Sequence, residues 1–191
     1  GDHILYLLAR RMRRGGTLRG GVVVATVMSN FWLEKRLSDE GMRLARAPVG
    51  DKYVLERMVT EDALLGGEQS GHVILRDRAT TGDGILTGLS LLDALLAEEM
   101  PLARILDGIV PFPQVLLHVR VRENPDLARH PVIGPVVREV ENQLGGSGRV
   151  LLRYSGTEPL ARVMVEGSDG DAVRRHAERL AEIIRGEIGA S

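Results

Sequence analysis

The chain has 191 residues, 43% of them hydrophobic, which is enough apolar surface to form the core of one large or two modest domains. Its 25 Lys and Arg residues nearly balance 26 Asp and Glu residues, so the net charge of −1 gives no electrostatic field suited to nucleic acid or an anionic membrane. The absence of cysteine excludes disulfides, thiolate metal ligands and cysteine nucleophiles. We therefore expect a cytoplasmic globular protein with no nucleic-acid or membrane partner.

Helices and strands are predicted to alternate through the first part of the chain. Capping residues and helical periodicity predict helices at about residues 2–14, 30–40, from 51 onward, and 83–99. A continuous apolar run predicts a strand at 22–27, and short strands are predicted at 43–47 and 72–75. This alternation is typical of a three-layer α/β domain.

The pattern changes at residues 107–113, where Pro111 and Pro113 flank a phenylalanine. We place a domain boundary there, which divides the chain into residues 1–109 and 110–191. The predicted elements that follow are a strand at 115–121, a helix at 131–144, a strand on each side of the segment 153–162, and a helix at 171–188. This order predicts a small α+β domain with a mainly antiparallel sheet.

The segment 153–162 reads Arg-Tyr-Ser-Gly-Thr-Glu-Pro-Leu-Ala-Arg and concentrates groups that bind phosphate. Arg153 ends one apolar run and Arg162 opens the next, so antiparallel strands would bring both guanidiniums to the same end of a hairpin. Between them, Ser155, Gly156 and Thr157 are turn-forming residues that expose hydroxyls and backbone N–H groups. An ordinary hairpin loop with surface arginines has the same composition, and no Walker-type loop is present.

A second polar segment, residues 66–72, reads Gly-Gly-Glu-Gln-Ser-Gly-His, and its glycines permit a tight backbone path. Glu68 can accept paired hydrogen bonds from vicinal hydroxyls, Ser70 can donate or accept, and His72 can exchange a proton near neutral pH. These groups can form the hydrogen bonds that sugar hydroxyls require. A solvated turn is the alternative interpretation of the same residues.

Metal chemistry has little support in the sequence. Asp83 stands between glycines before a long helix, where a helix cap and turn explain it better than a metal ligand does. The remaining histidines show no zinc-site spacing, and we interpret them as structural or exposed: His3, His118, His130 and His176. We therefore expect no metal bound by residues of this chain.

Residues 153–162 resemble the phosphate-binding loop of the α-D-phosphohexomutases, and residues 66–72 resemble the sugar-binding loop of the same family. Three further segments, 27–30, 49–54 and 80–84, resemble its bacterial phosphoglucosamine mutase branch, so the similarity covers nearly the whole chain. It implies that residues 1–109 form domain three, which binds the sugar, and that residues 110–191 form domain four, which binds phosphate.

The resemblance also implies roles for individual residues. Glu68 and Ser70 would contact sugar hydroxyls, and His72 would act as a general acid/base, unless backbone groups satisfy it as a structural histidine. Lys52 would be a cation near the substrate, or else an exposed residue at a helix start. The phosphate would be held by Arg153, Ser155, Gly156, Thr157 and Arg162.

Members of this family use a phosphoserine in domain one and a magnesium held by an Asp-x-Asp-x-Asp segment in domain two, and neither motif occurs in this sequence. We therefore expect the C-terminal half of a larger isomerase of amino-sugar and cell-wall precursor biosynthesis, inactive without the missing N-terminal domains. The whole enzyme would interconvert glucosamine 6-phosphate and glucosamine 1-phosphate, with Mg²⁺ and a hexosamine 1,6-bisphosphate primer as cofactors. A phosphomannomutase/phosphoglucomutase fragment and a non-catalytic sugar-phosphate-binding module are the alternatives, and a homodimer is left open.

Overall fold

The computed structural model of the protein describes residues 1–98 and 100–190. Its contacts divide the chain into two compact units, Gly1–Val110 and Pro111–Ser191, each with its own sheet. Residue 99, which we expected to end the long helix of the first part, lies outside the described residues.

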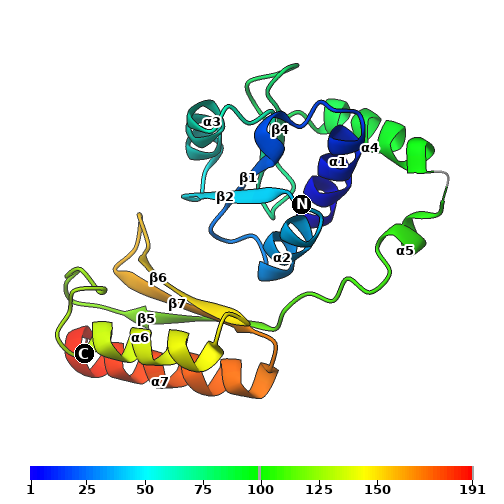
Figure 1. Ribbon diagram of the computed structural model, residues 1–191. Helices are drawn as coiled ribbons and strands as arrows, with labels where there is room; N and C mark the ends of the chain where they lie inside the picture. The colour runs from blue at the N-terminus through cyan, green and yellow to red at the C-terminus, as the bar shows by residue number, and fades with distance from the viewer. Residues whose placement is uncertain (99, 191) are drawn as a thin grey trace. The chain divides into compact units, whose positions relative to one another are not determined.

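The first unit is built on a four-stranded sheet with the order β2-β1-β3-β4 (Figure 1). Its strands are β1 (Val22–Thr26), β2 (Arg43–Ala47), β3 (Leu65–Gly67) and β4 (Val73–Leu75). β1 runs parallel to both β2 and β3, whereas β4 is antiparallel to β3. The whole of β1 is buried, which is why its sequence is a continuous apolar run.

Helices cover both faces of this sheet, and this confirms the predicted three-layer α/β architecture. They are α1 (Asp2–Arg14), α2 (Phe31–Asp39), α3 (Asp51–Thr60) and α4 (Gly84–Glu98), with a 3-10 turn at Arg19–Gly21 and a short α5 (Leu102–Ile105). α1 packs against α2 and α4, while α3 packs against β1, β2 and β3 (Figure 1). Asn30 caps α2 by accepting the Trp32 N–H, as predicted. Asp83 caps α4 in the same way, because its Oδ1 accepts two backbone N–H groups of the first turn.

Strand β3 differs from the prediction, because the sequence of residues 66–72 predicts a loop at Gly66 and Gly67. Both glycines are buried within the strand, and neither has a positive φ. Packing explains them instead: a Cβ at Gly66 would lie 2.5 Å from Met58 Sδ, and a Cβ at Gly67 would lie 2.4 Å from the backbone oxygen of His72. The glycines thus allow α3 and β4 to approach β3 closely.

Helix α4 leaves much of its apolar surface exposed. Ile85 and Leu96 are each 80% exposed, and Leu89 and Leu92 are more than half exposed.

At the end of α4, Glu98 is buried and its Oε2 lies 2.7 Å from Arg14 Nη1. Arg14 thus pairs within this chain, and it lies with Arg11 and Arg13 in the last turn of α1, where cations are favoured.

The second unit has a three-stranded antiparallel sheet with the order β5-β7-β6 and two helices, which confirms the predicted α+β domain (Figure 1). Its elements are β5 (Gln114–Arg120), α6 (Ile133–Leu144), β6 (Gly148–Tyr154), β7 (Leu160–Gly167) and α7 (Gly170–Ile188). α7 packs against β5 and β7, and α6 packs against β6 and α7. Alternate strand residues such as Val119, Val163 and Val165 join the helices in one buried core. The residues between them point to the other face of the sheet.

His176 on α7 predicts a pH dependence of stability. Burial, followed by the charges of Arg175 and Arg179, lowers the pKa of His176 from its usual value of 6.5, and Glu139 opposes the shift only in part. The folded state disfavours the charged ring. The contribution of His176 to the free energy of unfolding should therefore be fully present above pH 6.5, and it should be lost as the pH falls from 6.5 toward the folded-state pKa. Denaturant unfolding at about pH 7.5 and about pH 5.5 measures this loss, and His176→Gln should make it smaller. An unchanged difference in that variant would contradict the assignment.

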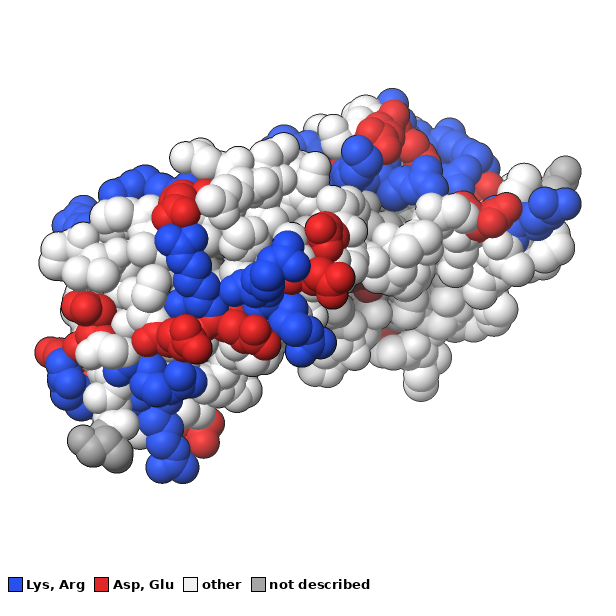
Figure 2. Space-filling model, turned by 90° about the horizontal axis from the view of Figure 1, so that it is seen from below, with Lys and Arg blue, Asp and Glu red and all other residues white. Residues whose placement is uncertain are grey.

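Charged residues of both signs are mixed on the surface. On the face shown in Figure 2, Lys and Arg side chains lie among Asp and Glu side chains, in keeping with the near-neutral net charge. One example of such pairing joins α6 to α7, where Arg179 Nη2 lies 2.7 Å from Glu139 Oε2. Within residues 1–98 and 100–190, no helix is both long and apolar enough to span a membrane.

Candidate functional site

The pairing of β6 with β7 places Arg153 directly opposite Arg162. The two arginines therefore lie at the same end of the hairpin, as the sequence predicts. Like charges on directly opposed residues repel each other, and burial, followed by the charge of Arg162, lowers the pKa of Arg153. A dianion bound between the guanidiniums would relieve this repulsion, and guanidiniums bind phosphate oxygens through paired, charge-assisted hydrogen bonds.

The loop that joins these strands carries the other predicted phosphate ligands. The Ser155 N–H donates to the Leu160 carbonyl at 2.8 Å, and the Ser155 hydroxyl accepts from Arg162 Nη2 at 3.4 Å. Gly156 and Thr157 are exposed. Gly156 has no positive φ, and an added Cβ would meet nothing within 4 Å, so the turn itself does not require glycine there. The missing side chain instead leaves this backbone open to a ligand.

Sequence reasoning missed the position of His118, which it treated as structural or exposed. β5 pairs with β7 so that His118 lies opposite Arg162, and His118, Arg162 and Arg153 form one row across the sheet. The row is on the face away from α6 and α7, because the intervening residues join the helix-facing core. The available signal was the alternation along residues 115–121, where His118 falls between apolar residues that share the other face.

In the first unit, residues 68–71 form the turn between β3 and β4. The Glu68 carboxylate accepts the Gly50 N–H at 2.8 Å through Oε1 and the Ser70 hydroxyl at 3.2 Å through Oε2. The turn closes with a hydrogen bond from the Gly71 N–H to the Glu68 carbonyl, and Gly71 has φ of 110°. Ser70 and Glu68 are thus brought together, with the carboxylate position fixed by the start of α3.

The start of α3 also brings Asp51 to this turn. Asp51 Oδ1 lies 3.3 Å from His72 Nδ1, and Glu68 Oε2 lies 3.7 Å from the same nitrogen. The His72 side chain is 66% exposed, so the ring is open to solvent and is not enclosed as a structural histidine. Lys52 is 79% exposed and its Nζ lies 3.9 Å from Glu56 Oε1, so the structure places it on the surface of α3.

Asp51, Glu68 and His72 form the one group of possible metal ligands found among the described residues, and their ligand atoms lie within 4.8 Å of one another. Glu68 is already engaged through both oxygens by protein donors. Exposed acidic clusters of this kind are common without a metal. The expectation that this chain binds no metal therefore stays a prediction.

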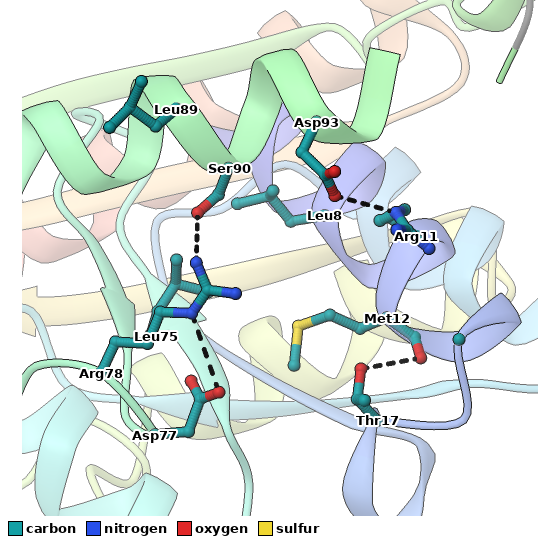
Figure 3. A pocket seen from close by; sticks show the side chains of 11 residues that line it. Leu8, Arg11, Met12, Thr17, Leu75, Asp77, Arg78, Leu89, Ser90 and Asp93 are labelled. Atoms are coloured by element: carbon teal, nitrogen blue, oxygen red, sulfur yellow. Dashed lines mark hydrogen bonds and ion pairs between the residues drawn. The ribbon is translucent and has the colours of Figure 1, made fainter. Parts of the chain in front are cut away.

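A separate cavity of about 570 Å³ lies between α1, α4 and the end of β4 (Figure 3). Its wall contains the Arg11–Asp93 ion pair at 3.0 Å, and Arg78 lies 3.5 Å from the Ser90 hydroxyl (Figure 3). None of the predicted sugar or phosphate residues lines this cavity. Residues of this cavity can therefore serve as a control in a ligand titration, because no effect of the ligand is expected on them.

Solved structures of sugar-phosphate mutases share the fold of this chain, and two of them illustrate the likeness. An N-acetylglucosamine-phosphate mutase in its substrate complex superimposes with a TM-score of 0.77 at 19% identity, over 96% of this chain and 43% of that chain. The Aspergillus fumigatus N-acetylphosphoglucosamine mutase in complex with GlcNAc-6P and magnesium gives a TM-score of 0.73 at 20% identity, over 96% of this chain and 46% of that chain. At such identities the likeness establishes the fold alone.

Curated relatives and family models match the sequence much more closely. A phosphoglucosamine mutase of Desulfovibrio desulfuricans is 50% identical over 188 residues, which cover 98% of this chain and 42% of the relative. The corresponding protein of Rhodospirillum rubrum is 52% identical over 88% of this chain and 38% of its own length. The chain thus spans about two-fifths of these relatives. Residues 1–112 match the phosphoglucomutase/phosphomannomutase alpha/beta/alpha domain III, and residues 116–183 match the C-terminal domain of the same family. The chain therefore belongs to the phosphoglucomutase/phosphomannomutase family, the α-D-phosphohexomutases, and carries its third and C-terminal domains.

Proposed function

We propose that this chain is the substrate-recognition part of a cytoplasmic phosphoglucosamine mutase, an isomerase that interconverts glucosamine 6-phosphate and glucosamine 1-phosphate. The observation that carries the proposal is the direct opposition of Arg153 and Arg162 on neighbouring strands, which suits a bound phosphate. Relatives of that name at about half identity support glucosamine as the sugar. Residues 1–109 would bind the sugar through Glu68 and Ser70, and residues 110–191 would hold the phosphate.

The chemical contribution of these residues is positioning. In the mutase, a phosphoserine on a preceding domain would donate phosphate to the sugar, and the bisphosphate would reorient before the other phosphate returned to the serine. The arginines, Ser155, Gly156 and Thr157 would hold the phosphate that is not reacting, and such remote contacts lower the barrier by orienting the reacting oxygen. His72 would exchange a proton with the hydroxyl that gains or loses phosphate.

Magnesium would belong to the preceding domains, where it would neutralise charge on the transferring phosphoryl group. The sequence contains no Asp-x-Asp-x-Asp segment, and the Asp51, Glu68 and His72 group has one carboxylate already engaged by protein donors. The residues of this chain therefore do not fit that role. We propose that the chain alone lacks mutase turnover, and that the hexosamine 1,6-bisphosphate primer acts on the whole enzyme.

Amide NMR tests the proposal directly on the 191-residue chain. Titration with glucosamine 6-phosphate should shift resonances of residues 153–162, with smaller shifts at 66–72, and should leave those of the cavity residues Leu8 and Ser90 in place. Inorganic phosphate should shift only the first group. If about 10 mM ligand causes no shift, the binding free energy is weaker than about −3 kcal/mol, and this chain is not a recognition module.

The alternatives differ in sugar preference. A phosphomannomutase/phosphoglucomutase fragment should respond to mannose 6-phosphate and glucose 6-phosphate as strongly as to glucosamine 6-phosphate at residues 66–72. A non-catalytic binding module would bind the ligand, but the whole gene product would lack the serine and magnesium segments. Assay of the longer protein with each sugar phosphate separates these cases.

A further inference from the structure

The side chain of Asp51 has no role in the mechanism proposed above, although it lies next to the proposed acid/base. Asp51 is the first residue of α3, and its Oδ1 is 3.3 Å from His72 Nδ1. Glu68 Oε2 is farther from that nitrogen, at 3.7 Å, and it accepts the Ser70 hydroxyl. Asp51 is therefore the nearer carboxylate for His72 Nδ1.

A carboxylate beside one ring nitrogen determines where a neutral histidine carries its proton. The neutral ring has one N–H donor and one acceptor nitrogen, and a carboxylate can only accept. Its presence next to Nδ1 therefore favours the Nδ1–H tautomer and leaves the lone pair on Nε2. Catalytic and metal-binding histidines are commonly oriented by an acidic partner in this way.

We propose that Asp51 is a positioning residue for His72, which keeps the proton on Nδ1 and so makes Nε2 the atom that exchanges a proton with a sugar hydroxyl. This inference rests on the proposed function, in which His72 is the acid/base. The two residues come from separate elements, because Asp51 begins α3 and His72 follows the turn after β3. The distance between them is therefore set by the packing of α3 on β3, in which Gly66 allows Met58 and Val54 to approach.

A purely structural role for Asp51 makes a different prediction. An acidic residue in the first turn of a helix interacts favourably with the helix dipole, so Asp51→Asn would then lower stability slightly and leave the His72 tautomer unchanged. The tautomer is thus the decisive quantity, and thermal unfolding of each variant shows whether the fold is intact.

The experiment is long-range ¹H–¹⁵N NMR of the His72 ring in the 191-residue chain, at about pH 8, above the usual titration range of histidine, and with EDTA present to exclude metal binding. The natural chain should show mainly the Nδ1–H tautomer. Asp51→Asn should lower the ratio of Nδ1–H to Nε2–H by about threefold or more, because it removes the carboxylate charge that lies 3.3 Å from Nδ1. Glu56→Gln is the control, because it removes an exposed carboxylate from the same helix and should leave the ratio unchanged.

The outcomes separate this inference from the proposed function. A ratio that Asp51→Asn does not alter, or a natural chain that is mainly Nε2–H, overturns the role of Asp51 even when glucosamine 6-phosphate binds at residues 153–162. A ratio of Nδ1–H to Nε2–H that falls in Asp51→Asn supports the proposed Asp51–His72 interaction. If no sugar phosphate binds to such a chain, the proposed function fails while the Asp51–His72 interaction stands.

Discussion

Simultaneous replacement of Arg153 and Arg162 by alanine is expected to abolish measurable binding of glucosamine 6-phosphate to this chain. The two side chains are directly opposed on β6 and β7, and one of them also donates to the Ser155 hydroxyl. Hydrogen bonds to charged groups contribute about 1.5–3 kcal/mol each, so losing one such bond from each arginine should weaken binding by a hundredfold or more, about 2.7 kcal/mol. Amide NMR titration or calorimetry measures the change.

The matched control for this variant is Arg174→Ala with Arg175→Ala. It removes the same two positive charges from exposed positions of α7, on the helical side of the unit. Binding should be unchanged in this control, because a general loss of positive charge has only a screened, long-range effect. Equal weakening by both double variants would mean that net charge attracts the ligand and that the arginine pair is not a site. Thermal unfolding of all three proteins excludes misfolding as the cause.

Gly67→Ala is expected to disturb both the fold and the proposed sugar-binding turn. Gly67 pairs directly with Val73, and an added Cβ would lie 2.4 Å from the His72 backbone oxygen and 3.1 Å from Val73 Cα. Backbone atoms cannot move aside as a flexible side chain can, so β3 and β4 must separate. Overpacking of this kind costs about 1–3 kcal/mol, and we expect the upper part of that range in the free energy of unfolding. The amides of residues 68–72 should shift as the turn moves.

Gly82→Ala is the control for this substitution, since it adds the same methyl group near the same residue. Its Cβ would lie 3.6 Å from His72 Cβ, which is ordinary van der Waals contact, and Gly82 has no positive φ. Stability should change by less than about 0.5 kcal/mol, as for most substitutions that break no special feature. If Gly67→Ala is as stable as Gly82→Ala and its turn resonances stay in place, close strand packing is not the reason for glycine at position 67.

The two variants test different parts of the proposed recognition. In the proposed function, the arginine pair would supply affinity for phosphate, whereas the turn of residues 68–72 would supply hydroxyl contacts and the proton exchange. A moderate phosphate affinity suits the proposed reaction, because the bisphosphate intermediate has to reorient before the second transfer. A chain that bound phosphate very tightly would slow that step.

Several features of this protein could be predicted from the sequence because they depend on local chemistry. The strands predicted at 22–27 and 43–47 form at Val22–Thr26 and Arg43–Ala47. Asn30 and Asp83 cap the helices that follow them, and the spacing of Arg153 and Arg162 around a turn predicts their proximity. Side-chain periodicity and capping act within a few residues, so one sequence is enough to detect them. The family resemblance of the two polar loops also depended only on consecutive residues.

The other features of the fold and the candidate site depend on tertiary packing. Gly66 and Gly67 were predicted as loop residues, but the close approach of α3 and β4 makes them a buried strand. The pairing of β5 with β7 adds His118 to the arginine row, and the packing of α3 on β3 brings Asp51 beside His72. The His118–Arg162 and Asp51–His72 contacts join residues more than 20 positions apart, where no local periodicity records the distance. The sequence by itself thus determined the chemistry available to the protein, and only the folded chain determined which of those groups meet, because pairing register and helix packing are properties of the whole domain.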